Sequence, residues 1–212
     1  NVVSSNLTIS SLAHPFNGKI DDVRIYDRAL SDSEIAALAN TLKYINFSEN
    51  KTTTNAVSLS INIPSGTDQG DLLIAAVAVD SDAAASLAAP SSQGWTLIDR
   101  NAYNSEVTLG VWWKIADDSE PASHTFTWTP SRQAYGWIMR FTGCDPSNPI
   151  NAFAAAGQAS STPTSPAVVT TVSDCIILRI GAFDDMDITP DDTGLANHSD
   201  ITMDKTGLVL FE

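Results

Sequence analysis

The sequence predicts an all-β protein, a β-sandwich of the jelly-roll or Greek-key kind with one short helix near residues 31–39. Three observations predict this class. Several short segments alternate between apolar and polar residues, which is the period of a half-buried strand. Turn signals rich in Gly, Pro, Asn, Asp and Ser separate these segments. Hydrophobic residues make up 43% of the 212 residues and charged residues only 17%, a composition typical of a folded domain.

The first element in chain order is a strand followed by a helix. Residues 19–28 alternate after a turn signal at Asn17-Gly18, which predicts a half-buried strand. Next, Ser31 and Glu34 fit the capping box, in which each side chain bonds a free N–H of the first helical turn. A short helix is therefore predicted from Ser31, and Asn40 is a suitable C-terminal stop.

The letters GKIDDVRIYDRALS and the following SEIAAL resemble the closing segment of laminin-G-like, concanavalin A-like jelly rolls of secreted bacterial proteins. The resemblance covers about residues 6–40 and implies that residues 1–42 are the last strands and helix of an incomplete jelly roll. In glucanase-type members, the Asp at the position of Asp21 helps to hold a structural calcium ion, a cation that prefers oxygen ligands. A solvated or turn-bonding carboxylate is the alternative for Asp21.

The second predicted unit covers residues 43–212. Residues 42–47 lead into the polar run 48–55, which we interpret as a linker or exposed turn. Residues 57–63 then alternate without a fault, which predicts a strand with one face in the core. The predicted core side chains of this strand are Val57, Leu59, Ile61 and Ile63.

Residues 71–79, DLLIAAVAV, have no polar side chain after Asp71, which predicts a strand covered on both faces. A buried helix is the alternative, but the short length and the flanking turns favour a strand. A loop over residues 83–94 and a strand over residues 95–98 follow. Segments 106–116, 124–128 and 134–141 then alternate, and we expect three successive strands of one sheet.

Within 106–116, the pattern predicts one face in the core and one face towards water. The predicted core face carries Val107, Leu109, Val111, Trp113 and Ile115, and the wet face carries Thr108, Gly110, Trp112 and Lys114. An exposed indole can bind a sugar by stacking, so Trp112 is a candidate ligand-binding residue. Coverage by a loop or a second sheet is the alternative. We predict core positions for Trp95, Trp113, Trp128 and Trp137.

In the C-terminal third of the chain, the apolar pattern predicts a weak strand at 150–159 and stronger strands at 168–172, 175–183 and 207–212. The segments GDLLIAAVAV, GWTLIDR, LGVWWKIADDSEPASHTFTW and RFTGCDPSNPI resemble a β-sandwich module that recurs in large secreted bacterial and phage-associated proteins. That module usually ends in further strands, so the resemblance implies truncation at the C-terminus. Cys144 and Cys175 lie beside apolar segments, either as buried free thiols or as one disulfide across the sandwich.

Charge and hydropathy exclude two classes of partner. The net charge is −14 and no run of Lys or Arg is present, so we expect no binding to nucleic acid or to an anionic membrane surface. The longest apolar run, residues 72–79, is far shorter than the roughly 20 residues of a membrane span, so we expect no membrane insertion.

No catalytic motif is recognisable. The three histidines lie in unrelated segments, and no GxSxG, HExxH or phosphate-loop pattern occurs, so we predict that the chain is not an enzyme. The catalytic carboxylates of concanavalin A-like glucanases lie on a strand that this chain lacks. The acidic residues Asp184, Asp185 and Asp187, together with Asp191-Asp192, can collect a calcium ion with backbone carbonyls, or they form a solvated loop.

These observations predict a non-catalytic extracellular module of a secreted or surface protein, which binds carbohydrate or a surface ligand or acts as an adhesin-like spacer. The alternative is a structural subunit of a filament or phage appendage, whose terminal strands at 7–9 or 208–211 complete the sheet of another copy. A glycoside hydrolase fragment is the third class. Expected partners are a glycan, a cell-surface ligand or copies of the chain itself, and calcium is the one candidate cofactor.

Overall fold

The computed structural model describes residues 26–31, 42–158, 164–173 and 175–182, together with the backbone of 208–211. The chain divides into two compact units, Asn1–Ala36 and Ala37–Glu212. Of the first unit, residues 26–31 are described and contain neither helix nor strand. The rest of the strand predicted at 19–28, the helix predicted near 31–39 and Asp21 lie outside the described residues.

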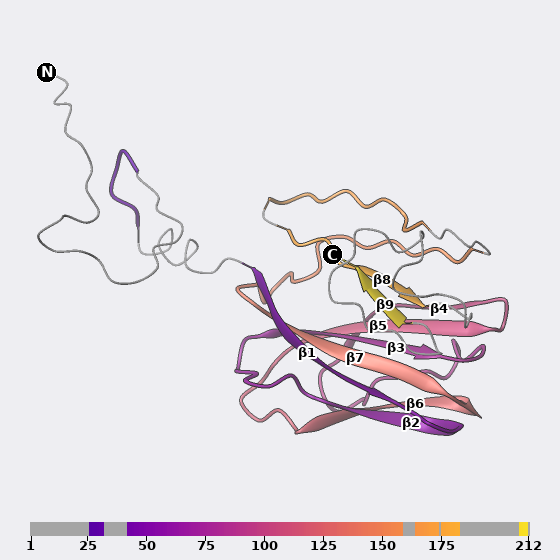
Figure 1. The fold of residues 1–212 in the computed structure, drawn as a ribbon. Helices are drawn as coiled ribbons and strands as arrows, with labels where there is room; N and C mark the ends of the chain where they lie inside the picture. Colours follow the sequence, from indigo (N-terminus) through magenta and orange to yellow (C-terminus); the bar gives the residue numbers. More distant parts are fainter. Residues whose placement is uncertain (1–25, 32–41, 159–163, 174, 183–207, 212) are drawn as a thin grey trace, which may run out of the picture. The chain divides into compact units, whose positions relative to one another are not determined.

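The second unit is built from antiparallel sheets (Figure 1). A five-stranded sheet has the order β1-β7-β3-β5-β4, and two smaller sheets pair β2 with β6 and β8 with β9. Strands are the only regular elements of the described part, so the all-β prediction is confirmed and the architecture is consistent with a β-sandwich. The strands are β1 (Lys43–Lys51), β2 (Ala56–Asn62), β3 (Leu72–Val79), β4 (Thr96–Tyr103), β5 (Val107–Ile115), β6 (Ser123–Arg132), β7 (Ala134–Thr142), β8 (Arg179–Ala182) and β9 (Leu208–Phe211).

Strand β3 is the centre of the fold. Its eight residues are all buried, and it pairs with β5 on one side and β7 on the other. The prediction of a strand covered on both faces is therefore confirmed, and the helix alternative is wrong. Alternate residues of β3 enter two separate apolar cores, one on each face of the five-stranded sheet.

The first core lies between the five-stranded sheet and the β2–β6 sheet. β2 contributes Leu59 and Ile61, and β6 contributes Phe126 and Trp128, which pack against alternate residues of β3. The second core covers the opposite face, where alternate residues of β3 and β7 pack against half-buried side chains of residues 178–182. The five-stranded sheet is thus covered on both faces, which explains its nearly continuous apolar sequences.

The prediction that residues 106–116, 124–128 and 134–141 form three successive strands of one sheet is wrong. β5 and β7 belong to the five-stranded sheet, whereas β6 crosses to the other layer and pairs with β2, placing Phe126 opposite Leu59. Alternation specifies that one face of a strand is buried, but a strand of either layer satisfies that requirement. The sequence pattern therefore predicted the three strands correctly but gave no information about which strands pair with one another.

The predicted faces of β5 are also reversed in burial. Thr108, Gly110, Trp112 and Lys114 are buried, whereas the alternate residues, including Trp113, are half-buried on the other face. The cause is visible at Gly110, where a Cβ atom would overlap the ring of Trp112. Because residues two apart share a face, the missing side chain of Gly110 makes room for the indole to lie along the strand inside the core.

Several smaller predictions need correction. Val57 is exposed rather than buried, because a register irregularity between Ala56 and Ser58 turns it outwards. The polar run predicted as a linker includes the last residues of β1, which pair with β7 up to Lys51. Residues 150–158, 168–172 and 175–178 are not strands, although the strand predicted at the C-terminus is present as β9. Trp95 is half-buried, and Trp128 and Trp137 are core residues as predicted.

Polar side chains of β1 bond carbonyl groups of β2 and of the residues that follow it. Asn46 Nδ2 donates to the Ser65 carbonyl at 3.0 Å, Ser48 Oγ donates to the Ile63 carbonyl at 3.1 Å, and Asn50 Nδ2 donates to the Ser60 carbonyl at 2.8 Å. Carbonyls that would otherwise be open to another chain therefore have partners within the domain.

Candidate functional site

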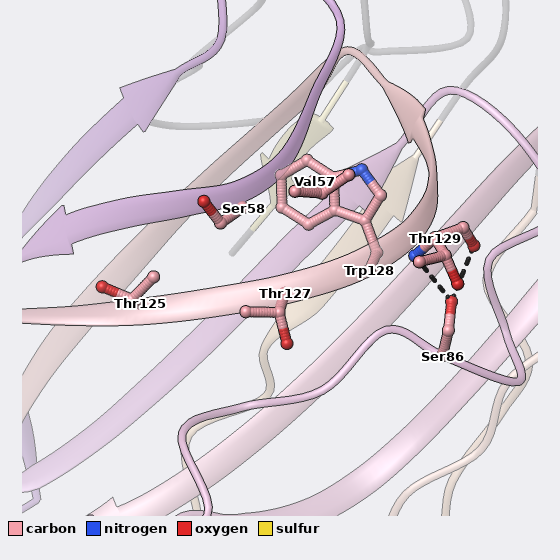
Figure 2. Close-up of a pocket in the computed structure, with 7 residues that line it drawn as sticks. All are labelled: Val57, Ser58, Ser86, Thr125, Thr127, Trp128 and Thr129. Atoms are coloured by element: carbon pink, nitrogen blue, oxygen red, sulfur yellow. Dashed lines mark hydrogen bonds between the residues drawn. The ribbon is translucent and has the colours of Figure 1, made fainter.

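A shallow depression on the β2–β6 sheet is the candidate ligand site (Figure 2). It has a volume of about 500 Å³. Val57 and Trp128 supply the apolar part of its lining. The remaining lining residues all carry a hydroxyl group and are Ser58, Ser86, Thr125, Thr127 and Thr129.

The alternation of β6 places these hydroxyls. His124, Phe126 and Trp128 are buried, so Thr125, Thr127 and Thr129 face outwards. They come from the run HTFTWT, whose pattern signals a strand with one wet face, although the sequence analysis did not single out these threonines.

The loop between β3 and β4 forms one wall. The backbones of Ala88 and Thr127 exchange two hydrogen bonds of 2.8 and 3.0 Å. Ser86 Oγ donates to the Thr129 carbonyl at 2.7 Å and accepts the Thr129 N–H at 2.9 Å, as Figure 2 shows. These bonds fix Ser86 beside β6, so the lining is held in place before any ligand arrives.

Trp128 has an unusual environment within this site. The residue is only 2% exposed, and its indole Nε1 is a buried donor without a hydrogen-bond partner. Val57, which lines the same depression, is 50% exposed. The site therefore combines a buried donor without a partner, a half-exposed apolar side chain and a rim of hydroxyls, and its described lining carries no charged group.

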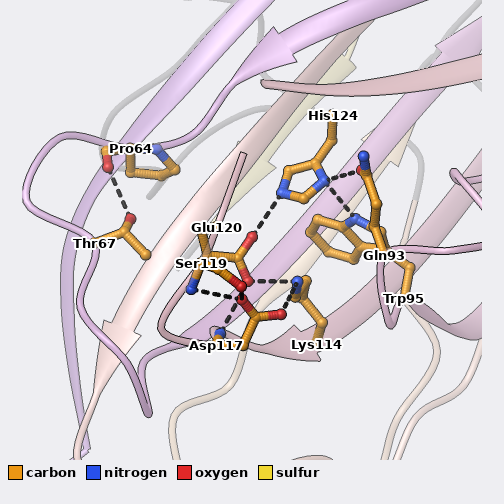
Figure 3. A network of polar contacts seen from close by, with 9 residues as sticks. All are labelled: Pro64, Thr67, Gln93, Trp95, Lys114, Asp117, Ser119, Glu120 and His124. Carbon is orange, nitrogen blue, oxygen red and sulfur yellow. Dashed lines mark hydrogen bonds and ion pairs between the residues drawn. The ribbon is translucent and has the colours of Figure 1, made fainter. Parts of the chain in front are cut away.

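A second polar feature is a buried cluster at the end of β5 and the start of β6 (Figure 3). The Lys114 ammonium pairs with Glu120 Oε1, and Glu120 Oε2 lies 3.1 Å from His124 Nε2. The side chains of Lys114, Glu120 and His124 are 2%, 6% and 0% exposed. We call these three residues the buried cluster.

His124 is held as a neutral imidazole. Trp95 Nε1 lies 3.1 Å from His124 Nδ1, and because an indole only donates, Nδ1 accepts and Nε2 carries the proton towards Glu120. Gln93 Oε1 lies 2.6 Å from Nδ1, so an accepting Nδ1 requires the Gln93 amide to be turned with its NH2 group towards the ring. Burial lowers the pKa of His124, and the neighbouring Glu120 carboxylate opposes this shift.

The buried cluster braces the turn between β5 and β6. Glu120 Oε1 also accepts the N–H of Asp117 at 3.0 Å, and Asp117 Oδ1 accepts the N–H of Ser119 at 2.9 Å. That second bond lowers the pKa of the exposed Asp117 carboxyl. Because its three side chains are closed to solvent, the cluster offers no reactive surface, and loss of one charged partner would leave the other charge buried and unpaired.

The predicted site residues have different outcomes. Trp112 is 4% exposed and packs in the first core, with its ring centroid 5.3 Å from that of Phe126. It is therefore not an exposed stacking platform, and the alternative of coverage by a second sheet is confirmed. Cys144 and Cys175 are both half-buried free thiols, without the disulfide of the other alternative. Burial raises the pKa of the Cys144 thiol.

The structure does not describe the residues that were predicted to bind calcium. Asp21, Asp184, Asp185 and Asp187, and also Asp191-Asp192, lie outside the described residues. Within those residues, no group of three or more His, Cys, Asp or Glu side chains has the geometry to hold a metal ion. Calcium binding by these carboxylates stays a prediction.

Comparison with known proteins gave no relative: no family model matches the chain, and neither a curated protein nor a solved structure matches it. The part of the chain that the structure describes contains no helix with the length and apolar character that crossing a bilayer requires.

Proposed function

We propose that this chain is a non-catalytic module of a secreted or surface protein and that it binds a neutral carbohydrate in the depression on the β2–β6 sheet. The observation that carries the proposal is the uncharged lining of hydroxyl groups around the apolar surface of Val57 and Trp128. The extracellular setting follows from the sequence resemblance to modules of secreted bacterial proteins.

The chemistry of the lining suits a sugar. Sugars present hydroxyls that both donate and accept hydrogen bonds, and their C–H faces are apolar. Serine and threonine hydroxyls have the same dual capacity, so each can adapt to a ligand hydroxyl in either role. Small-molecule sites typically have volumes of roughly 300–1,000 Å³, and the depression lies within that range at about 500 Å³.

The charge of the protein selects among sugars. A net charge of −14 repels anionic ligands at long range, so sialylated or sulfated glycans are disfavoured relative to neutral ones. Glu120 and His124 of the buried cluster contact each other inside the domain, and neither residue lines the depression.

A glycan array tests the proposal, with neutral and anionic glycans and with and without calcium. Binding to neutral glycans should fall strongly in Thr127→Arg, which places a long charged side chain in the depression. Asn62→Arg is the matched control, because Asn62 is exposed on the neighbouring strand β2 but does not line the depression. The proposal fails if no neutral glycan binds, or if both variants lose binding equally.

A second candidate function is assembly with other copies of the chain. Residues 151–158 and 164–170 belong to no helix or strand, have no backbone–backbone hydrogen bonds within the described part, and expose Phe153 and Val169. Unpaired extended segments can add to a strand of a neighbour. Light scattering tests this: the parent chain should form concentration-dependent oligomers, and Val169→Lys should be monomeric. A parent chain that is monomeric at high concentration refutes assembly.

A further inference from the structure

We infer that the carbohydrate recognised in the depression carries an N-acetyl group, and that the Trp128 indole N–H is the donor that recognises its carbonyl oxygen. This inference rests on the proposed function and adds the identity of the ligand class. It begins from Trp128 Nε1, a buried donor without a hydrogen-bond partner in a residue that lines the depression.

The unused atom is Trp128 Nε1. Buried donors are normally paired, because an unpaired buried donor has lost its hydrogen bond to water without replacement. Two of the rim hydroxyls already have protein partners, since Ser86 is bonded to Thr129 and Thr125 Oγ1 lies 2.7 Å from Ser60 Oγ, whereas Thr127 and Thr129 are exposed and can bond water. A ligand that supplies an acceptor to Nε1 therefore gains more from this atom than from hydroxyls that already have partners.

An acetamido group matches the surroundings of this donor. Its carbonyl oxygen is a strong acceptor for the indole N–H, and its methyl group is apolar, as are Val57 and the indole ring. The hydroxyl that glucose carries at the same carbon is shorter than the acetamido group, so it does not reach the buried Nε1, and it lacks the methyl group. The two parts of the acetamido group thus match the two chemical properties that distinguish this corner from the hydroxyl rim.

Because Nε1 is buried, a ligand reaches it only after a lining side chain moves, and Val57 is the candidate. The nitrogen is buried in the unliganded structure, whereas Val57 in the same lining is half exposed. Exposed side chains change rotamer within picoseconds to nanoseconds, so a turn of the Val57 side chain is a rapid step. Val57 also lies at the register irregularity of β2, where the ladder bonds that would restrain a strand residue are interrupted.

The test compares two probes, the β-1,4-linked trimer of N-acetylglucosamine and the β-1,4-linked trimer of glucose. They differ at carbon 2, where one has an acetamido group and the other a hydroxyl. Calorimetry should show tighter binding of the acetylated trimer. Trp128→Phe should weaken that binding by about three- to tenfold, the equivalent of one ordinary hydrogen bond, and should leave binding of the glucose trimer unchanged.

Trp137→Phe is the matched control. Trp137 also has a buried Nε1 without a partner, but it belongs to the second core on the other face of the five-stranded sheet. The same replacement there should leave both affinities unchanged. Equal loss in the two variants would indicate an effect through stability and would overturn the role of Trp128.

A measurement on the unmodified chain covers the case in which Trp128→Phe does not fold. The indole N–H resonance of Trp128, assigned through the methyl groups of Val57, should move downfield on addition of the acetylated trimer and not on addition of the glucose trimer. If it does not move while the trimer binds, the inference is wrong. If the glucose trimer binds as tightly as the acetylated trimer, the inference is wrong and the proposed function stands. If neither trimer binds and no other neutral glycan binds, the inference and the proposed function are both wrong.

Discussion

Replacement of Lys114 by methionine is the sharpest test of the buried cluster. Methionine nearly preserves the length of the aliphatic stem but removes the ammonium that pairs with Glu120. The Glu120 carboxylate, 6% exposed, is then left with only the neutral donors His124 and the Asp117 N–H. Removing one partner of a buried ion pair typically costs about 3–5 kcal/mol, because the other charge stays desolvated.

The size of the effect follows from this number. With a urea m value of about 2 kcal/mol/M, typical of a small domain, a loss of about 3–5 kcal/mol lowers the unfolding midpoint by about 1.5–2.5 M. The double variant Lys114→Met, Glu120→Gln contains no buried charge at these positions. We therefore expect its midpoint to lie above that of Lys114→Met alone, and the double-mutant cycle to give a coupling energy of about 1–3 kcal/mol.

The assay is equilibrium unfolding in urea at pH 7.5, followed by tryptophan fluorescence. All four proteins of the cycle are compared, and the slopes must agree for the midpoints to report stability. A loss of less than about 1 kcal/mol in Lys114→Met would show that the ammonium contributes no more than an exposed pair. A double variant with strictly additive losses would equally refute the reasoning.

Three further predictions follow from the same structure. The pKa of His124 is below its usual 6.5, so the unfolded chain takes up the proton at a higher pH than the folded chain does. The free energy of unfolding should therefore fall as the pH drops below about 6.5. Urea midpoints at pH 7.5 and 5.5 should differ less in His124→Gln than in the parent chain. Gly110→Ala should cost about 1–3 kcal/mol by displacing the Trp112 ring, with a changed tryptophan emission spectrum as its signature, and a spectrum and stability like the parent's would refute the overlap. Thr108→Val should cost about 1–3 kcal/mol, since it removes the hydroxyl that accepts the Ala83 N–H. That amide should also exchange its hydrogen faster, whereas the outward-facing Thr125→Val should change stability by less than about 0.5 kcal/mol.

Sequence reasoning was most successful in segments where the pattern of apolar and polar residues is compatible with one kind of burial only. Residues 72–79 contain no polar side chain, and a strand covered on both faces is the arrangement that satisfies such a run. The alternating run around Phe126 similarly predicted a strand with one wet face. In both segments the local pattern and the tertiary environment agree, so local reasoning was sufficient.

Local reasoning failed where packing on one strand depends on another layer. In β5 both faces are covered, so alternation could not decide which face is the inner one, and the fit of Trp112 over Gly110 decided it. Burial of Lys114 depends on Glu120, which reaches it from the following turn. A cation within an apolar run followed closely by acidic residues was the available signal for this pair.

The depression was not predicted because three separated segments form it. β2, β6 and the loop that carries Ser86 come together only in the folded unit. Its most exposed apolar side chain, Val57, depends on a register irregularity that the perfect alternation of residues 57–63 conceals. Neither strand pairing nor the position of a bulge is encoded in a local hydrophobic pattern.

The pairing of β1 with β7 has a consequence for how the chain is made. Glu49 of β1 bonds to Tyr135 of β7, 86 residues further along the chain. At typical rates of synthesis, the first strand waits on the order of ten seconds before its neighbour leaves the ribosome. The wholly apolar strand β3 is synthesised within that interval, so the centre of the sheet leaves the ribosome before β7 is there to pair with it.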